Sequence, residues 1–223
     1  AGELLISNGT KGLVGELCIT EPRASSHLVS GLNKRLVPPR MTRKDRAVPI
    51  ATEQVIAYLP SHIAQAMQNG NRPKSLEGEH RKVTIIFINI LGINEVLDQQ
   101  GPEGLLGELQ RYMSTVLRFC EQYGGFVSSN DTYTMGIKLI LTFGAPIAHE
   151  HNAANALRLG LRLNHELPQL NLHLSHRIGI NNGFVFAGEV GPPYRRQYTV
   201  MGDAVNLAAR LMSSCQPGQI LAS

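Results

Sequence analysis

The sequence predicts an α/β fold, an α+β sandwich of the ferredoxin-like type, over residues 81–223. Short apolar runs rich in β-branched residues alternate there with longer amphipathic segments, in the order β-α-β-β-α-β. Glycine steps typical of turns mark several junctions, at Gly101-Pro102, Gly124-Gly125 and Gly191-Pro192. The 223 residues are 43% hydrophobic and 17% charged, which is ordinary for a globular chain with one good core and part of a second.

The first predicted element is a buried strand over 82–90, within the run VTIIFINILGIN (83–94). Four β-favouring residues lead into Phe87, one polar residue, Asn89, lies near the end, and Gly92 marks the turn that follows. The later elements follow from the same periodicities. They are a helix (102–123), two strands (125–132 and 137–143), a helix (149–167), two strands (175–182 and 184–190), a short strand (197–201) and a helix (203–213).

The segments before this domain have shorter predicted elements and a less regular pattern of apolar residues. Residues 1–41 are predicted to form a strand, a short helix and a strand, and residues 42–80 a linker with amphipathic helices interrupted at Pro60. The opening AGELLIS echoes the closing QPGQILAS, and aligning the two pairs Leu5 with Leu221. The echo indicates that the chain begins late in one repeat and ends at the same point of the next.

Charge and composition argue against several functions. The net charge is +4, and much of it lies in the basic run 33–46, where no aromatic residues interleave with the lysines and arginines. We therefore expect a solvated linker there and no nucleic-acid partner. No apolar run approaches the roughly 20 residues that span a bilayer, so no membrane partner is expected. Three widely spaced cysteines, Cys18, Cys120 and Cys215, argue against a disulfide framework and favour a cytoplasmic location.

The run RRQYTVMGDAVNLAARLM (195–212) holds the candidate functional residues. Gly202 ends a strand, Asp203 is a suitable N-cap, and a helix is predicted to follow. Asn206 and Arg210 are four residues apart and so project from one face of that helix. An amide and a guanidinium together suit a polyphosphate or a developing oxyanion. The alternative is a surface helix whose arginine pairs with Asp203 or a neighbouring loop.

The longer run RIGINNGFVFAGEVGPPYRRQYTVMGDAVNLAARL (177–211) resembles the signature of class III nucleotidyl cyclases, the adenylyl and guanylyl cyclase homology domain. Two landmarks agree in order, VTIIFINILGI for the first strand and turn and LILTFGAP (139–146) for the third strand. The resemblance implies the cyclase homology fold for residues 81–223, truncated at the C-terminus. It also implies that residues 1–41 are the C-terminal tail of a preceding cyclase domain, in the tandem arrangement of bacterial and soluble-type adenylate cyclases.

In that family two domains meet head to tail and build sites across their interface. The resemblance implies that one half supplies two aspartates that hold two divalent metals. The other half supplies an asparagine and an arginine that stabilise the transition state, together with residues that recognise the base. Carried over onto this sequence, the asparagine is Asn206, the arginine is Arg210, and Thr199 occupies a position that contacts the base.

The metal-binding positions depart from the family pattern. Asn89 stands where the first metal aspartate is expected, and Ile137, after Gly136, stands where the second is expected. Without an anionic pair this domain should hold no metal of its own, so Mg²⁺ or Mn²⁺ is expected in the partner domain. The family's adenine-recognising lysine is replaced by Tyr133 or Met135, which leaves ATP as the family default and GTP as the alternative.

These observations imply the second, metal-free domain of a tandem class III adenylate cyclase. It would convert ATP to cyclic AMP and pyrophosphate only as a pseudo-heterodimer with a metal-bearing cyclase domain. The alternative is a non-catalytic pseudocyclase that acts as a dimerisation or nucleotide-sensing module. We also expect residues 1–41 to fold into the open sheet edge that the truncation leaves.

Overall fold

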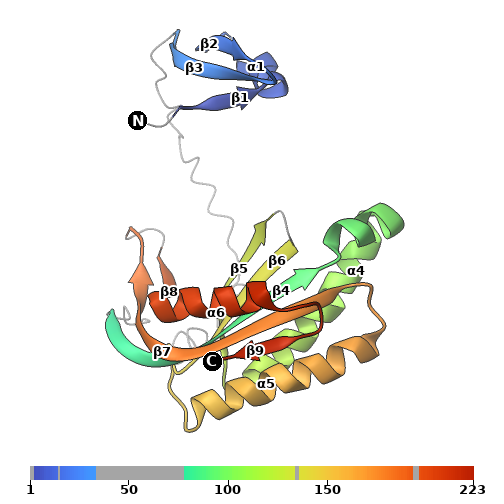
Figure 1. The fold of residues 1–223 in the computed structure, drawn as a ribbon, viewed down its shortest axis with the longest axis vertical. Helices are drawn as coiled ribbons and strands as arrows, with labels where there is room; N and C mark the ends of the chain where they lie inside the picture. Colours follow the sequence, from blue (N-terminus) through green and yellow to red (C-terminus); the bar gives the residue numbers. More distant parts are fainter. Residues whose placement is uncertain (1–2, 15, 34–77, 134–135, 193–195) are drawn as a thin grey trace, which may run out of the picture. The chain divides into compact units, whose positions relative to one another are not determined.

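The computed structural model describes residues 3–14, 16–33, 78–133, 136–192 and 196–223 (Figure 1). The chain divides into two compact units, Ala1–Gln68 and Asn69–Ser223. The predicted linker with amphipathic helices, residues 42–80, lies outside the described residues except for its last three, of which Glu79 and His80 already belong to the first strand of the second unit. None of the helices in the described ranges is long and apolar enough to cross a bilayer.

The first unit is a small antiparallel sheet with one short helix. Its elements are β1 (Leu5–Ser7), α1 (Asn8–Val14), β2 (Cys18–Arg23) and β3 (Ser26–Leu32), and the strand order is β1-β3-β2. The predicted strand, helix and strand are present, with one more strand than expected. The expected completion of the large sheet by residues 1–41 is wrong for the described residues, because these three strands form a separate sheet.

The second unit is a six-stranded sheet covered by helices on both faces. The strands follow the order β5-β6-β4-β7-β8, all antiparallel, and the last strand, β9, pairs in parallel with β7. The order β-α-β-β-α-β over the first part of this unit confirms the predicted ferredoxin-like α/β fold. The elements are β4 (Glu79–Leu91), α4 (Ile93–Gln122), β5 (Phe126–Tyr133), β6 (Gly136–Phe143), α5 (Asn152–Glu166), a 3₁₀ turn (Leu167–Leu170), β7 (Ser175–Val190), β8 (Gln197–Met201), α6 (Asp203–Ser214) and β9 (Ile220–Ala222).

Two predicted boundaries lie at glycines, and the structure treats the two glycines differently. β7 is one continuous strand through Gly183 instead of two, because its pairing with β4 runs unbroken from Ala187 to Ser175. In α4 the helix predicted from residue 102 is present after Gly101, whose φ of 73° and ψ of −179° are not helical, but a helical stretch that was not predicted precedes the kink from Ile93. Gly101 therefore marks a break between two helical stretches, whereas Gly183 does not end its strand.

A buried carboxylate holds the kinked helix together. Glu108, on α4 after the kink, accepts a hydrogen bond from Gln100 Nε2 before the kink at 2.9 Å. It also accepts from the His173 backbone N–H at 2.9 Å and lies 2.7 Å from His173 Nδ1, in the loop that enters β7. Burial alone would raise the pKa of Glu108, but hydrogen bonds from His173, Gln100 and Leu174 outweigh burial and lower it. The ionised Glu108 thus fixes the start of β7 relative to α4.

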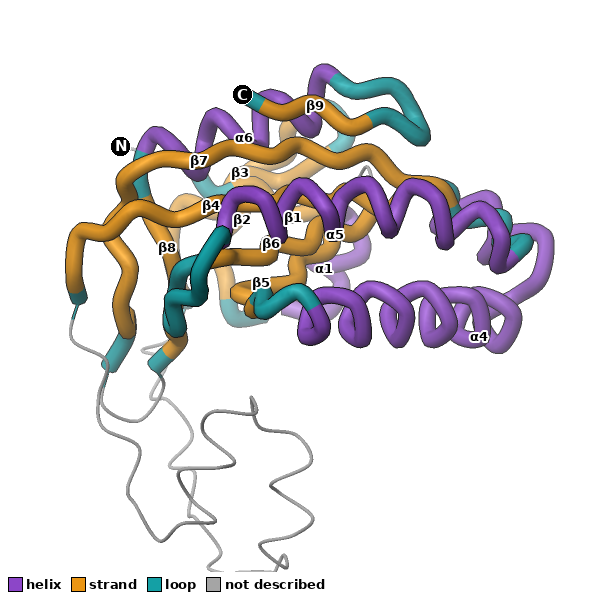
Figure 2. The backbone as a smooth tube through the Cα atoms, turned by 90° about the horizontal axis from the view of Figure 1, so that it is seen from below, coloured by secondary structure: helices purple, strands orange, loops and turns teal. Residues whose placement is uncertain are grey.

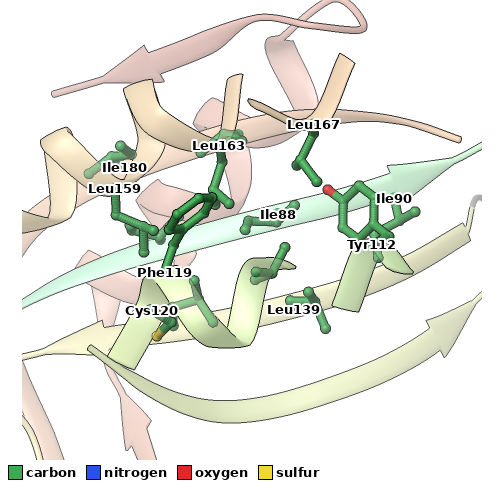
Figure 3. Close-up of a cluster of buried hydrophobic side chains, with 14 of the residues drawn as sticks. Ile88, Ile90, Tyr112, Phe119, Cys120, Leu139, Leu159, Leu163, Leu167 and Ile180 are labelled. Carbon is green, nitrogen blue, oxygen red and sulfur yellow. The ribbon is translucent and has the colours of Figure 1, made fainter. Parts of the chain in front are cut away.

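The alternation of β4 divides the core into two clusters. Ile86, Ile88 and Ile90 face α4 and α5, and this first cluster includes Phe119 and Leu163 from those helices (Figure 3). The odd-numbered residues Val83, Ile85 and Phe87 face α6 in the second cluster. In Figure 2, α6 and α4 lie along opposite margins of the second unit with strands between them. Each fully buried aliphatic or aromatic side chain stabilises such a core by about 1.5–3 kcal/mol.

Glycines on β7 let α6 lie close to the sheet. A Cβ at Gly179 would come within 2.3 Å of the Ala208 carbonyl oxygen, and one at Gly183 within 2.7 Å of the Ala204 side chain. The N-terminal end of α6 therefore lies over Gly183, and its later turns lie over Gly179. This placement fixes which face of α6 points away from the sheet.

Candidate functional site

α6 begins at Asp203, one residue earlier than an N-cap at Asp203 implies. Gly202, with φ of 141° and ψ of 175°, is the N-cap, and no side chain caps the helix. Asp203 is instead the first helical residue, where its carboxylate interacts favourably with the positive end of the helix dipole. The glycine allows the sharp turn between β8 and α6, so the helix starts directly at the end of the strand.

Asn206 and Arg210 lie on the face of α6 that points away from the sheet. Ala208 and Met212 are buried beneath the helix, whereas Asn206 and Arg210 are exposed, which confirms that the two share a face. Within the part of the chain that the structure describes, neither side chain makes a hydrogen bond or an ion pair. The alternative pairing of Arg210 with Asp203 is therefore not seen, and both donors face solvent.

Thr199 lies on the neighbouring strand but on a different face. It pairs with Gly188 in the β7–β8 ladder and is half-buried. Tyr198 and Val200 pack against the cluster beneath α6, so the side chain of Thr199 leaves the strand on the opposite face. No hydrogen bond joins it to Asn206 or Arg210 among the described residues. The structure thus places Thr199 next to α6 in the chain without bringing it to the exposed pair.

Asn89 is enclosed at the end of β4. Its exposed fraction is 0%, and its place in the alternation puts its side chain on the same face of the sheet as α6. A Cβ at Gly136 would come within 3.3 Å of Asn89 Oδ1, which shows how closely the start of β6 approaches this amide. The predicted polar residue at the mouth of the strand is therefore covered, and its amide has no open path to a ligand.

Ile137 lies on the other face of the sheet. It pairs with Ile90 of β4 and packs against the first cluster, between the sheet and α4 and α5. The two predicted metal positions thus point to opposite faces and carry no carboxylate. The described residues contain no group of three or more His, Cys, Asp or Glu side chains that could hold a metal ion. These residues do not fit a site for Mg²⁺ or Mn²⁺.

Two cations flank Asn89 instead, and the sequence reasoning missed this arrangement. Lys138 of β6 pairs directly with Asn89 on one side, and Arg177 of β7 pairs with it on the other. Directly paired residues of antiparallel strands point to the same face, so all three side chains lie on the α6 face. Arg177 Nη1 donates to the Ser213 carbonyl oxygen at 3.3 Å, near the C-terminus of α6. Only the strand register could have revealed this row.

The comparisons with known proteins agree with this architecture. The family model described as "Adenylate and Guanylate cyclase catalytic domain" matches residues 76–223. An uncharacterized protein of Mycobacterium tuberculosis (strain ATCC 25618 / H37Rv) is 29% identical over 232 residues, which cover 100% of this chain and 35% of that protein. The chain therefore spans about a third of the length of the first curated relatives it matches.

Solved structures of cyclases share the fold. The adenylyl cyclase CyaB from P. aeruginosa is 29% identical with a TM-score of 0.58, over 66% of this chain and 79% of that one. The guanylyl cyclase Cya2 is 28% identical with a TM-score of 0.54, over 66% of this chain and 76% of that one. A bacterial light-regulated adenylyl cyclase is 26% identical with a TM-score of 0.59, over 72% of this chain and 48% of that one. The chain belongs to the family of adenylate and guanylate cyclase catalytic domains.

Proposed function

We propose that residues 81–223 are the metal-free half of a class III adenylate cyclase. They would convert ATP to cyclic AMP and pyrophosphate only together with a metal-bearing cyclase domain that holds Mg²⁺ or Mn²⁺. The observation that carries this proposal is a contrast within one domain. Asn206 and Arg210 are exposed together on α6, while Asn89 and Ile137 offer no carboxylate at the metal positions.

The chemistry of ring closure explains why Asn206 and Arg210 would be retained. The ribose 3′-hydroxyl attacks the α-phosphorus, a new P–O bond forms, and pyrophosphate leaves with the bonding electron pair. Negative charge grows on the phosphoryl oxygens during this step, and a preorganised guanidinium and amide stabilise it. Arg210 and Asn206 would serve this role across the interface with the partner, and Thr199 would contact the base.

The proposal includes the arrangement around this half-site. Residues 1–41 would be the C-terminal tail of a preceding cyclase domain, which would supply the metal-bearing partner in the same protein. The substrate would be ATP, with GTP as the alternative, since the position of the family's adenine-recognising lysine is changed. The three cysteines are free thiols, two of them buried, which suits the proposed cytoplasmic location.

The direct test is the substitution Arg210→Ala in the assembled pair. We expect kcat to fall by roughly 10²–10³ when this chain is mixed with a metal-bearing partner domain, ATP and Mn²⁺, because one preorganised donor is lost. Arg158→Ala is the matched control, since Arg158 lies exposed on α5 and bonds only to Asn155 Oδ1, at 3.0 Å, among the described residues. An unchanged kcat for Arg210→Ala, or full activity of this chain without a partner, would overturn the proposal.

A second candidate function is a non-catalytic pseudocyclase that senses nucleotides or promotes dimerisation. The absence of a carboxylate at Asn89 and at Ile137 favours this reading, since a domain without metal ligands could still bind a nucleotide or a partner domain. Nucleotide binding without product formation in the assembled pair would support it. Product formation that depends on Arg210 would exclude it.

A further inference from the structure

We propose that a cavity between α4 and the 3₁₀ turn after α5 binds a small organic phosphate, that is, a phosphate monoester with a short apolar part. The cavity, called here the α4 cavity, has a volume of about 370 Å³. Its lining residues are Gly107, Gln110, Arg111, Ser114, Thr115 and Leu170. It lies on the α4–α5 side of the sheet, whereas α6 lies on the other side (Figure 2). The α4 cavity therefore shares no residue with the exposed pair on α6.

Helical spacing builds one wall of the α4 cavity. Gly107, Arg111 and Ser114 follow one another at intervals of four and three residues, so they lie along one side of α4. Gly107 keeps this side open, because a Cβ at this position would have no neighbouring atom within 4 Å. Leu170, in the 3₁₀ turn Leu167–Leu170, is the lining residue that does not come from α4, and it forms the facing wall.

Arg111 is a preorganised cation at this cavity. Its Nη2 donates a hydrogen bond to the Leu170 carbonyl oxygen at 2.7 Å, which ties the guanidinium to the facing wall. This is its one hydrogen bond among the described residues, so most donors of its planar fork can reach a phosphate oxygen. The carboxylate nearest to Arg111 in the sequence, that of Glu108, does not line the cavity. Glu108 is buried and already accepts hydrogen bonds from Gln100 and His173.

Three neutral polar side chains complete the set of donors. Gln110, Ser114 and Thr115 line the cavity, and none of their side chains hydrogen-bonds to any residue that the structure describes. Thr115 is only 8% exposed. A hydroxyl buried to this degree normally has a hydrogen-bond partner, because burying it without one costs free energy. A ligand in the α4 cavity would supply the partner that Thr115 lacks.

The donors and the volume together select the class of ligand. A phosphate monoester presents three acceptor oxygens, which match a guanidinium, two hydroxyls and an amide better than the two oxygens of a carboxylate do. Sites for small molecules span about 300–1,000 Å³, so the α4 cavity is at the small end of that range. A phosphate group alone would leave space beside Leu170, and an apolar part of the ligand fits there.

The test titrates the whole chain with phenyl phosphate and follows the backbone amides by NMR. We expect chemical-shift changes in residues 107–115 and around Leu170. Arg111→Gln is expected to weaken binding about tenfold or more, because a charge-assisted contact is lost. Arg158→Gln is the matched charge control and should bind like the parent chain, since Arg158 is exposed on α5 and bonds to Asn155. Benzoate, which carries a carboxylate on the same ring, should bind several-fold more weakly.

Two substitutions of Gly107 separate ligand binding from a structural role of Arg111. Gly107→Ala has room for its Cβ and should keep the parent affinity. Gly107→Leu places a larger side chain in the cavity and should abolish binding. Both variants should unfold at a higher temperature than the parent, because glycine is a poor residue inside a helix. A purely structural tie between Arg111 and Leu170 would leave phenyl phosphate binding unchanged in Gly107→Leu.

Each contrary outcome overturns a stated part of the proposal. No chemical-shift change, changes confined to α6, or equal binding by the parent and Gly107→Leu would show that the α4 cavity is not a binding site. Equal losses in Arg111→Gln and Arg158→Gln would reduce the effect to general charge attraction. Benzoate binding as tight as that of phenyl phosphate would overturn the phosphate class. Circular dichroism verifies that each variant is folded. The proposed function has a separate readout, since Arg210→Ala acts on kcat in the assembled pair.

Discussion

At the scale of single residues, Tyr112 and His176 are two buried polar groups whose rings are in contact. Their exposed fractions are 1% and 4%, and their rings meet edge to face with centroids 6.1 Å apart. Neither Tyr112 Oη nor His176 Nε2 has a hydrogen-bond partner in the described part of the chain. Figure 3 shows the Tyr112 hydroxyl among hydrocarbon side chains, near Leu167. Burial lowers the pKa of His176 to about 4 and raises that of Tyr112.

The buried imidazole predicts a loss of stability in mild acid. His176 has a pKa of about 4 in the folded state and 6.5 as the ordinary value, so below pH 6.5 the unfolded chain binds more protons. The neutral His176 side chain makes its full contribution to the free energy of unfolding above pH 6.5. This contribution is lost as the pH falls towards 4, by about 3 kcal/mol in total. Urea unfolding at pH 7.5, 6 and 5 measures this slope. His176→Phe should flatten it, and His165→Gln, at an exposed position, should not; equal slopes in all three proteins would contradict the assignment.

At the scale of elements, local periodicity predicted most strands and helices but not their pairing. β4, β6 and β8 fall close to their predicted ranges because alternation and β-branched residues act locally. The prediction split β7 at Gly183 and missed the helical stretch before Gly101, because the role of a glycine depends on what packs around it. Ala204 covers Gly183, and Glu108 bridges the kink at Gly101 through Gln100. Tertiary contacts of this kind leave no local signature.

The same limit applies to the candidate site. Asn206 and Arg210 could be placed on one face from their spacing alone, because both lie on one helix. The faces of Ile137 and Lys138 depend on the register of β6 against β4, which one sequence does not specify. The metal positions could therefore be identified as degenerate from residue types, whereas the cations beside Asn89 emerged only from the strand pairing.

The register also predicts that restoring the two aspartates does not restore a metal site. Ile137 is half-buried against the first cluster, so Ile137→Asp places a carboxylate against the core and should lower the free energy of unfolding by about 1–3 kcal/mol. Ile137→Val, the conservative control, should cost about 0.5–1.5 kcal/mol at most. Urea unfolding compares the three proteins, and calorimetry tests Mn²⁺ binding to the double variant with Asn89→Asp. Tight Mn²⁺ binding by the double variant would show that β6 adopts another register.

At the scale of the whole molecule, the two units differ in how far their apolar side chains are buried. The second unit contains both buried clusters. The first unit has no buried residue within 3–14 and 16–33, and Leu13 is 87% exposed there. β1 and β9, the two copies of the sequence echo, illustrate the difference. β9 joins the six-stranded sheet against β7, whereas β1 pairs with β3 in the small sheet.

This contrast predicts two levels of protection in amide hydrogen exchange on the whole chain. Segments with few buried apolar contacts open at low free-energy cost, so amides of β1, β2 and β3 should exchange within seconds to minutes. Amides of β4 and β7, which pair along their full length between two packed faces, should exchange only through global unfolding. β5 is the internal control, since it is an edge strand of the large sheet and should lie between these limits. Protection of β1–β3 equal to that of β4 would contradict this prediction and would mean that another surface covers these strands. Because the proposed function assigns residues 1–41 to a preceding cyclase domain, the same exchange measurement would then be repeated with that domain added.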